Sequence, residues 1–168
     1  PIISAFAVQR DEQRNLMLVT DILIGNDTIR LFNIHLESFR FGFDDYDFLT
    51  QVDLNSNNDK IRDGSKKVLK KLRDANIKRS KEVRQLRTYT QASAFPVIVC
   101  GDFNDTPSSF TYAFMSKHLK DAFRESGRGL GNSYAGKLPS FRIDYILYDD
   151  YFSSANYRTH RVHYSDHY

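Results

Sequence analysis

The sequence contains no tryptophan, one cysteine and only four prolines among its 168 residues. The single cysteine, Cys100, excludes an intramolecular disulfide framework. No apolar run approaches the roughly 20 residues that a membrane-spanning helix needs, and no secretory signal is visible. The chain begins at Pro1 rather than Met and ends at Tyr168, just after a charged motif. We therefore expect both natural termini to lie outside it, so the sequence leaves localisation and oligomeric state open.

The composition is that of an ordinary globular domain, with 40% hydrophobic and 27% charged residues. This length is enough for one domain with one core, so we expect residues 1–168 to form a single domain that is truncated at both ends. The formal net charge of +3 is modest. It favours a polyanionic partner only weakly.

Hydrophobic patterning predicts strands in several parts of the chain. Residues 15–24 and 28–36 flank a Gly-Asn-Asp turn and are typical of a β-hairpin. An apolar run predicts a strand over 95–103, and two further strands are expected over 142–148 and about 156–164. Strands and helices mix without strict alternation, which indicates two packed sheets flanked by helices.

Two helices are also predicted. Apolar residues at spacings of three, four and seven indicate an amphipathic helix over 59–91, with a gap near Arg79 and a break allowed near Asn76. A second helix is expected over 110–117, with a serine cap at its start. About twelve Lys and Arg lie between Lys60 and Arg87. Three interpretations of these cations stay open. They form a solvated helix face, they contact nucleic-acid phosphates, or they attract an anionic membrane surface.

The segment 38–58 is rich in Asp, Asn and aromatic residues, and we interpret it as an irregular excursion with at most a short helical turn. Two interpretations of its rings stay open: ordinary packing, or a stacking or lipid-contacting surface beside His35. The rings are Phe39, Phe41, Phe43, Tyr46 and Phe48. Tyr134, in a glycine-rich loop, is a candidate for the rim of the same pocket.

Four short polar motifs lie at or near predicted strand ends. Together they supply two imidazoles, three carboxylates and two carboxamides. The motifs are Asn33-Ile34-His35, Gly101-Asp102-Phe103-Asn104, Arg142-Ile143-Asp144 and Ser165-Asp166-His167. Each alone is common in structural settings, but the set contains what a metal-assisted phosphoryl transfer requires. A divalent cation neutralises the phosphate, a carboxylate activates water, and an imidazole beside an aspartate binds a phosphoryl oxygen. Hard oxygen ligands favour Mg²⁺ or Mn²⁺.

These four motifs, in this order, resemble the signature of the endonuclease/exonuclease/phosphatase superfamily, which includes deoxyribonuclease I-like metal-dependent phosphoesterases. The resemblance extends from His35 to His167, nearly the whole chain. It implies an α/β fold, namely a four-layer α/β/β/α sandwich, present here as the later part of the domain without its early strands. It also implies an Mg²⁺- or Mn²⁺-dependent hydrolase of phosphodiesters or phosphomonoesters that acts by in-line attack of an activated water.

The resemblance further implies a role for each motif residue. Asp102 would activate the attacking water, and Asn104 would hold the phosphate or the pentacovalent transition state. His167 would contact the phosphate while pairing with Asp144, and His35 would be the second catalytic imidazole. Metal ligation would fall to Asp166, with Asp102 and Asn104 as further candidates. Asn33 would support its loop, and Arg142 is either an ion-pair partner or a substrate ligand.

The chain departs from the family pattern in one respect. The family carries a metal-binding Glu on an early strand, and nothing ahead of His35 matches it, so we expect that Glu, and the missing N-terminal segment of the same domain, upstream of this chain. Substrate class stays open: a nuclease or general phosphodiesterase is favoured over a phospholipid or inositol-phosphate hydrolase. Expected partners are a phosphate ester, including nucleic acid or an anionic lipid head group. A non-catalytic binding module on the same fold is the remaining alternative.

Overall fold

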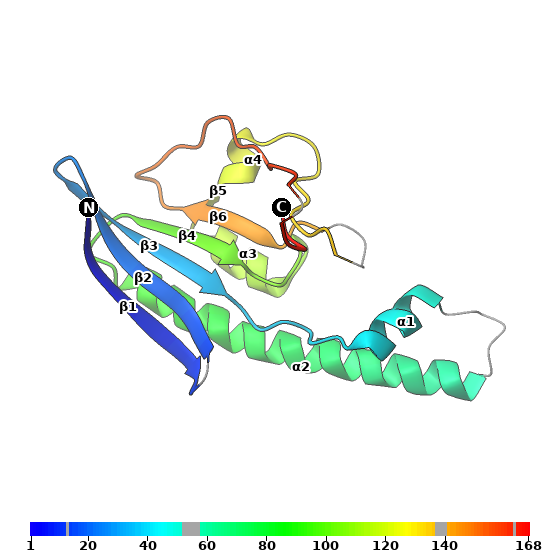
Figure 1. The fold of residues 1–168 in the computed structure, drawn as a ribbon. Helices are drawn as coiled ribbons and strands as arrows, with labels where there is room; N and C mark the ends of the chain where they lie inside the picture. The colour runs from blue at the N-terminus through cyan, green and yellow to red at the C-terminus, as the bar shows by residue number, and fades with distance from the viewer. Residues whose placement is uncertain (13, 52–57, 137–140, 163) are drawn as a thin grey trace.

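The computed structural model describes residues 1–12, 14–51, 58–136, 141–162 and 164–168. Within them one mixed sheet of six strands runs in the order β1-β2-β3-β4-β6-β5 (Figure 1). The strands are β1 (Ile2–Asp11), β2 (Arg14–Ile24), β3 (Asp27–His35), β4 (Val97–Asp102), β5 (Lys120–Asp121) and β6 (Asp144–Tyr148). The helices are α1 (Phe43–Gln51), α2 (Asn58–Gln91), α3 (Phe110–Ser116) and α4 (Ala122–Ser126).

The core lies between one face of the sheet and helices α2 and α3. Phe32 and Val99 on neighbouring strands are fully buried in one cluster with Val83 and Leu86 of α2 and Met115 of α3. Helix α2 runs along the sheet and continues beyond it, where α1 lies beside it (Figure 1). The predicted α/β class is therefore confirmed, and one sheet with its helices agrees with an incomplete sandwich.

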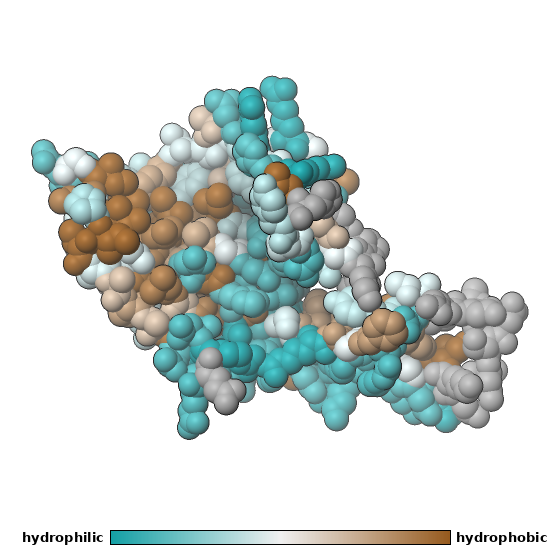
Figure 2. Space-filling model, in the orientation of Figure 1, coloured by the Kyte–Doolittle hydropathy of each residue, from teal (hydrophilic) through white to brown (hydrophobic). Residues whose placement is uncertain are grey.

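The opposite face of the sheet leaves apolar side chains exposed. The strand pairings align one row of residues across this face: Ala7, Leu18, Asn33, Cys100 and Ile146. Leu18 is 45% exposed and Ile146 is 41% exposed. Cys100 is half-buried because it lies on this face. Figure 2 shows hydrophobic side chains gathered over the strands near the N-terminus.

Most predicted elements are present. The hairpin is β2 and β3, the strand over 95–103 is β4, and Ser109 caps α3 by accepting a hydrogen bond from the amide of Tyr112. Part of the excursion over 38–58 is helix α1, while residues 52–57 and loop residues 137–140 lie outside the described residues. Within the described part of the chain, no helix is long and apolar enough to cross a bilayer.

Two predictions about the elements are wrong. Helix α2 continues through Asn76 without a break, because the buried Arg79 has polar partners in neighbouring segments. Residues 156–162 form no strand, and residue 163 lies outside the described residues. Asn156 has φ of 57°, a left-handed conformation that is incompatible with an extended strand. Strand β1 was not predicted.

Candidate active site

The sheet aligns three of the predicted site residues on adjacent strands. The parallel pairing of β3 and β4 sets His35 opposite Asp102, and the antiparallel pairing of β4 and β6 sets Asp102 opposite Asp144. His35 Nε2 lies 3.6 Å from Asp102 Oδ2. Residues directly opposite one another on neighbouring strands share a face, so one imidazole and two carboxylates converge at one end of the sheet.

Gly101 permits this close approach of β3 and β4. Its φ is +130°, and a Cβ added to it would lie 2.1 Å from the carbonyl oxygen of Ile34. A side chain at this position would push apart the two strands that carry His35 and Asp102.

The loop after β4 is held by its own polar side chains. Asp102 Oδ1 accepts a hydrogen bond from the amide of Asn104 at 2.7 Å, and Asn104 Nδ2 donates to the carbonyl oxygen of Leu36 at 2.9 Å. Asn104 has φ of 51°, a conformation that asparagine tolerates better than most residues. Burial raises the pKa of Asp102, and nearby Asp144 raises it further, although Asn104, His167 and His35 oppose this. Asp102 is thus a carboxylate in a partly desolvated site with hydrogen-bond donors close by.

The C-terminal motif reaches the same place through contacts with the glycine-rich loop. The amide of Ala135 donates to the carbonyl oxygen of Asp166 at 2.8 Å, and Tyr134 and His167 form a β-bridge. His167 Nδ1 lies 2.8 Å from Asp144 Oδ2. Burial lowers the pKa of His167, but the bond to Asp144 and the surrounding carboxylates outweigh it and raise the pKa overall. The His167–Asp144 pair therefore favours an imidazolium facing the cleft.

One cleft of about 1150 Å³ is lined by all the predicted catalytic and metal-ligating residues and by Asn33. The predicted residues are His35, Asp102, Asn104, Asp144, Asp166 and His167. Tyr134 is part of the same lining, as expected for the rim, and its ring lies 5.5 Å from that of His167. Residues more than a hundred positions apart in the chain thus share one concave site.

Aromatic side chains of the 38–58 segment form a further wall of this cleft. Phe39, Phe41 and Tyr46 line it. The Phe39 and Phe41 rings stack at 5.3 Å, and Tyr46 meets Phe41 edge-on at 5.9 Å. The rings pack against one another, which confirms the packing interpretation for these three residues, while a stacking or lipid-contacting role stays a prediction.

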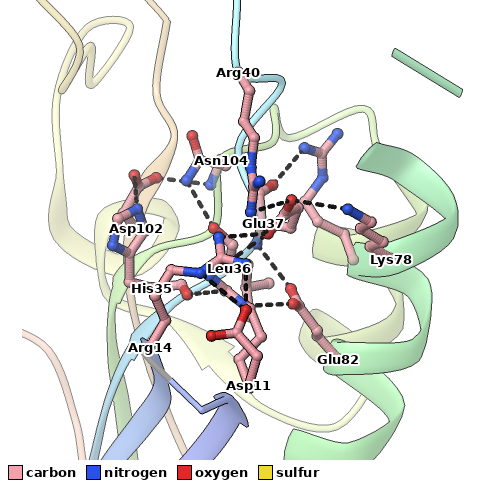
Figure 3. A network of polar contacts seen from close by, with 12 residues as sticks. Asp11, Arg14, His35, Leu36, Glu37, Arg40, Lys78, Glu82, Asp102 and Asn104 are labelled. Carbon is pink, nitrogen blue, oxygen red and sulfur yellow. Dashed lines mark hydrogen bonds and ion pairs between the residues drawn. The ribbon is translucent and has the colours of Figure 1, made fainter. Parts of the chain in front are cut away.

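A buried charge network lies directly beside the site, and the sequence did not predict it (Figure 3). The Glu37 side chain is 3% exposed, and four cations lie within 3.7 Å of its carboxylate. These are Arg10, Arg14, Arg40 and Lys78. Arg10 also donates to the carbonyl oxygen of His35, so the network supports the residue that carries the first imidazole.

Arg79 joins the two loops of the site to helix α2. Its side chain is fully buried; Nε donates to Asp105 at 3.1 Å and Nη1 donates to the carbonyl oxygen of Glu37 at 2.8 Å. Its guanidinium also lies 4.4 Å from the centre of the Phe39 ring. Burial lowers the pKa of Arg79, while Asp105 opposes the shift. The gap in the apolar pattern of α2 was the sequence signal for this residue.

Arg142 is an ion-pair partner, which decides between its two predicted roles. It is buried, and Nη1 lies 2.6 Å from Asp121 Oδ2. Its guanidinium lies over the rings of Phe123 and Tyr145 at 4.7 and 4.6 Å. Arg142 does not line the cleft.

The residues present fit part of a metal site. Asp102, Asn104 and Asp166 offer carboxylate and amide oxygens to one cleft, which suits a hard divalent cation. Among the described residues, however, no three His, Cys, Asp or Glu side chains converge on one point. Glu37 does not complete the set, because cations already surround its carboxylate.

The sequence pattern of the Endonuclease/Exonuclease/phosphatase family matches residues 48–167, well over half of the chain. The chain belongs to this family. Members of the endonuclease/exonuclease/phosphatase family are generally hydrolases of phosphoesters and typically use divalent metal ions. Among curated proteins, none matches the sequence.

Several solved structures of endonuclease/exonuclease/phosphatase type share the fold. A D. rerio TDP2 humanized by 14 mutations aligns with a TM-score of 0.56 and 15% identity, covering 94% of this chain and 54% of that one. Sphingomyelinase C from Streptomyces griseocarneus aligns with a TM-score of 0.52 and 18% identity, covering 89% of this chain and 50% of that one. The human Nocturnin catalytic domain with bound sulfate aligns with a TM-score of 0.51 and 16% identity, covering 89% of this chain and 48% of that one. This chain thus spans about half the length of the structures it matches.

Proposed function

We propose that this chain is part of a metal-dependent phosphoesterase that hydrolyses a phosphodiester or phosphomonoester by in-line attack of an activated water. The observation that carries the proposal is the convergence of His35, Asp102, Asp144 and His167 on one cleft. Family membership supports phosphoester hydrolysis as the general reaction.

Each side chain has a role that its surroundings favour. Asp102 accepts the proton of the attacking water, because its carboxylate lines the cleft beside Asp144 and lies 3.6 Å from His35 Nε2. Asn104, fixed by its bonds to Leu36 and Asp102, donates to a phosphate oxygen. His167, kept cationic by Asp144, and His35 bind the developing negative charge or protonate the leaving oxygen.

A divalent cation would complete the site. Mg²⁺ or Mn²⁺, held by Asp166 together with Asp102 and Asn104, would neutralise charge on the phosphate and the leaving oxygen. The remaining chemistry belongs to the protein side chains: they orient the ester, take up the proton of water and supply a proton to the leaving group.

We favour a nuclease or general phosphodiesterase, because exposed cations accompany the cleft and its rings offer stacking surfaces for bases. A phospholipid or inositol-phosphate hydrolase is the second candidate. The observation that favours a lipid ester is the apolar wall, where Leu49, Val68 and Leu72 join the aromatic rings.

The test uses the protein at its full natural length. Hydrolysis of plasmid DNA, RNA, an inositol polyphosphate, sphingomyelin and bis-p-nitrophenyl phosphate is measured with Mg²⁺, with Mn²⁺ and with a chelator. The proposal expects turnover of at least one class that the chelator abolishes. Metal binding without turnover of any substrate would instead indicate the non-catalytic binding module.

A further inference from the structure

Arg40 has a strained backbone at the edge of the catalytic cleft. Its φ is 50°, a left-handed conformation that arginine rarely adopts. Among the described residues, only Asn104 and Asn156 share a positive φ without being glycine, and Asn104 lines the same cleft as Arg40. Such strain persists only where surrounding contacts impose it, and it gathers at functional sites.

The contact that fixes the Arg40 side chain is the buried carboxylate of Glu37. Arg40 Nη2 lies 2.9 Å from Glu37 Oε1, and Lys71 Nζ donates to the carbonyl oxygen of Arg40 at 3.3 Å. Lys78 Nζ lies 3.2 Å from the same Oε1. Figure 3 shows Arg40 and Lys78 meeting at Glu37, close to Asn104. Glu37 therefore holds two cations in place, of which Arg40 lines the cleft.

Both cations keep the capacity to bind a further anion. The side chains of Arg40 and Lys78 are 51% and 56% exposed, whereas that of Glu37 is 3% exposed. A guanidinium has five N–H donors, and a single carboxylate uses only some of them. Arg10 and Arg14 have carboxylates of their own besides Glu37, namely Glu82 and Asp11. The buried carboxylate of Glu37 thus orients the exposed guanidinium of Arg40 at the cleft edge.

We infer that Arg40, oriented by Glu37 and assisted by Lys78, binds a second phosphate group of the substrate, next to the one that is hydrolysed. This inference rests on the proposed function and narrows it: the substrate is a phosphate ester that carries another phosphate. Charged, nearly planar guanidinium groups suit phosphate oxygens, and a preoriented side chain loses little freedom on binding. The second phosphate belongs either to a nucleic-acid strand or to a phosphorylated inositol.

The experiment measures preference for the second phosphate with the full-length protein. One substrate pair is a dinucleotide with and without a terminal phosphate at either end; the other is an inositol bisphosphate with and without its second phosphate. The readout is the ratio of kcat/KM within each pair. Wild type is expected to prefer the doubly phosphorylated member of one pair by about tenfold, which also identifies the source.

Arg40→Gln should reduce that preference roughly to unity, chiefly through KM. Arg73→Gln is the matched control, because Arg73 lies on α2 with a 73% exposed side chain outside the cleft, and it should leave the ratio unchanged. A wild-type ratio near one in both pairs, or an Arg40→Gln ratio equal to that of wild type, would overturn the inference.

A separate binding measurement tests this inference independently of the proposed hydrolysis. Equilibrium binding of both doubly phosphorylated compounds is measured by calorimetry in an Asp102→Asn background, which needs no turnover. A roughly tenfold weaker Kd on adding Arg40→Gln supports the second-phosphate site even if no substrate is hydrolysed. Equal Kd values with and without Arg40 would contradict it.

Discussion

Glu37 is a buried carboxylate whose ionised form is stabilised by neighbouring cations. Burial alone would raise its pKa, but the bond from Lys78 and the charges of Arg40, Lys78 and Arg10 outweigh burial and lower the pKa overall. A carboxyl whose pKa is lower in the folded state than in the unfolded state stabilises the fold above the unfolded value. That contribution is lost as pH falls from about 4.3 through the folded pKa.

Glu37→Gln should therefore reduce the free energy of unfolding by about 2 kcal/mol at neutral pH, because its cations lose their charge partner. The loss should shrink as pH falls below about 4. Urea unfolding at pH 3.5, 5 and 7 measures both effects. Glu125→Gln is the control, since Glu125 is exposed on α4. Equal losses at all three pH values would show that the carboxylate charge is not what stabilises this region.

Some residues of the site could be predicted from the sequence, and others could not. The motifs predicted a shared site, and the structure brings His35, Asp102 and Asp166 to one cleft, while their catalytic roles stay predictions. Glu37 and Arg79 were missed as parts of the site. A buried charge is stable only with its partners, and those partners come from separate segments that no local pattern connects.

Helix α2 carries a buried cation at a position where its pattern would place an apolar side chain. Arg79 lies between Ala75 and Val83, both buried on the core side. Its hydrogen bonds reach the segment after β3 and the loop after β4. Helix α2 thus fixes the separation of the loop that follows His35 and the loop that carries Asn104.

Arg79→Met should lower the free energy of unfolding by about 3 kcal/mol, because it leaves Asp105 without its partner and a buried carbonyl without a donor. Arg73→Met, on the exposed face of the same helix, should cost less than about 0.5 kcal/mol. Urea unfolding monitored by circular dichroism compares the two. Similar small losses for both variants would mean that the Arg79 contacts add little to stability.

Elements that have a turn motif or a helix cap in their own sequence were predicted well. Elements that form only through pairing with another strand were not. The hairpin of β2 and β3 has a turn motif, and α3 has a serine cap. Strand β1 pairs with a single neighbour, β2, and most of its side chains are exposed, so its pattern is weak. Residues 156–162 have a strand-like sequence but form no strand in the structure, where the ring of Tyr157 instead packs edge-on against that of Phe123 with the ring centres 5.6 Å apart.

The molecule as a whole exposes an apolar sheet face opposite its helices. Leu18 and Ile146 lie in one row across this face. Exposed apolar side chains of this kind bind hydrophobic dyes and promote association. The core on the helix side does not include either side chain.

A Leu18→Thr, Ile146→Thr double variant of this chain should bind less of the dye ANS than wild type. Threonine suits strands, so the free energy of unfolding should change by less than about 1 kcal/mol. Leu69→Thr is the control, since Leu69 is 63% exposed on α2, away from the sheet row. Dye fluorescence that stays at the wild-type level would show that this face does not form the dye-binding surface.

The most direct test of the central claim is the effect of Asp102→Asn on metal-dependent phosphoester hydrolysis by the full-length protein. Asp150→Asn is the matched control, because its side chain is 92% exposed and pairs with Lys120 at the surface. The account predicts that Asp102→Asn lowers kcat/KM by about 10²–10⁴-fold with the fold intact, while Asp150→Asn leaves it near the wild-type value. Wild-type activity in Asp102→Asn would contradict the assignment of this cleft as the active site.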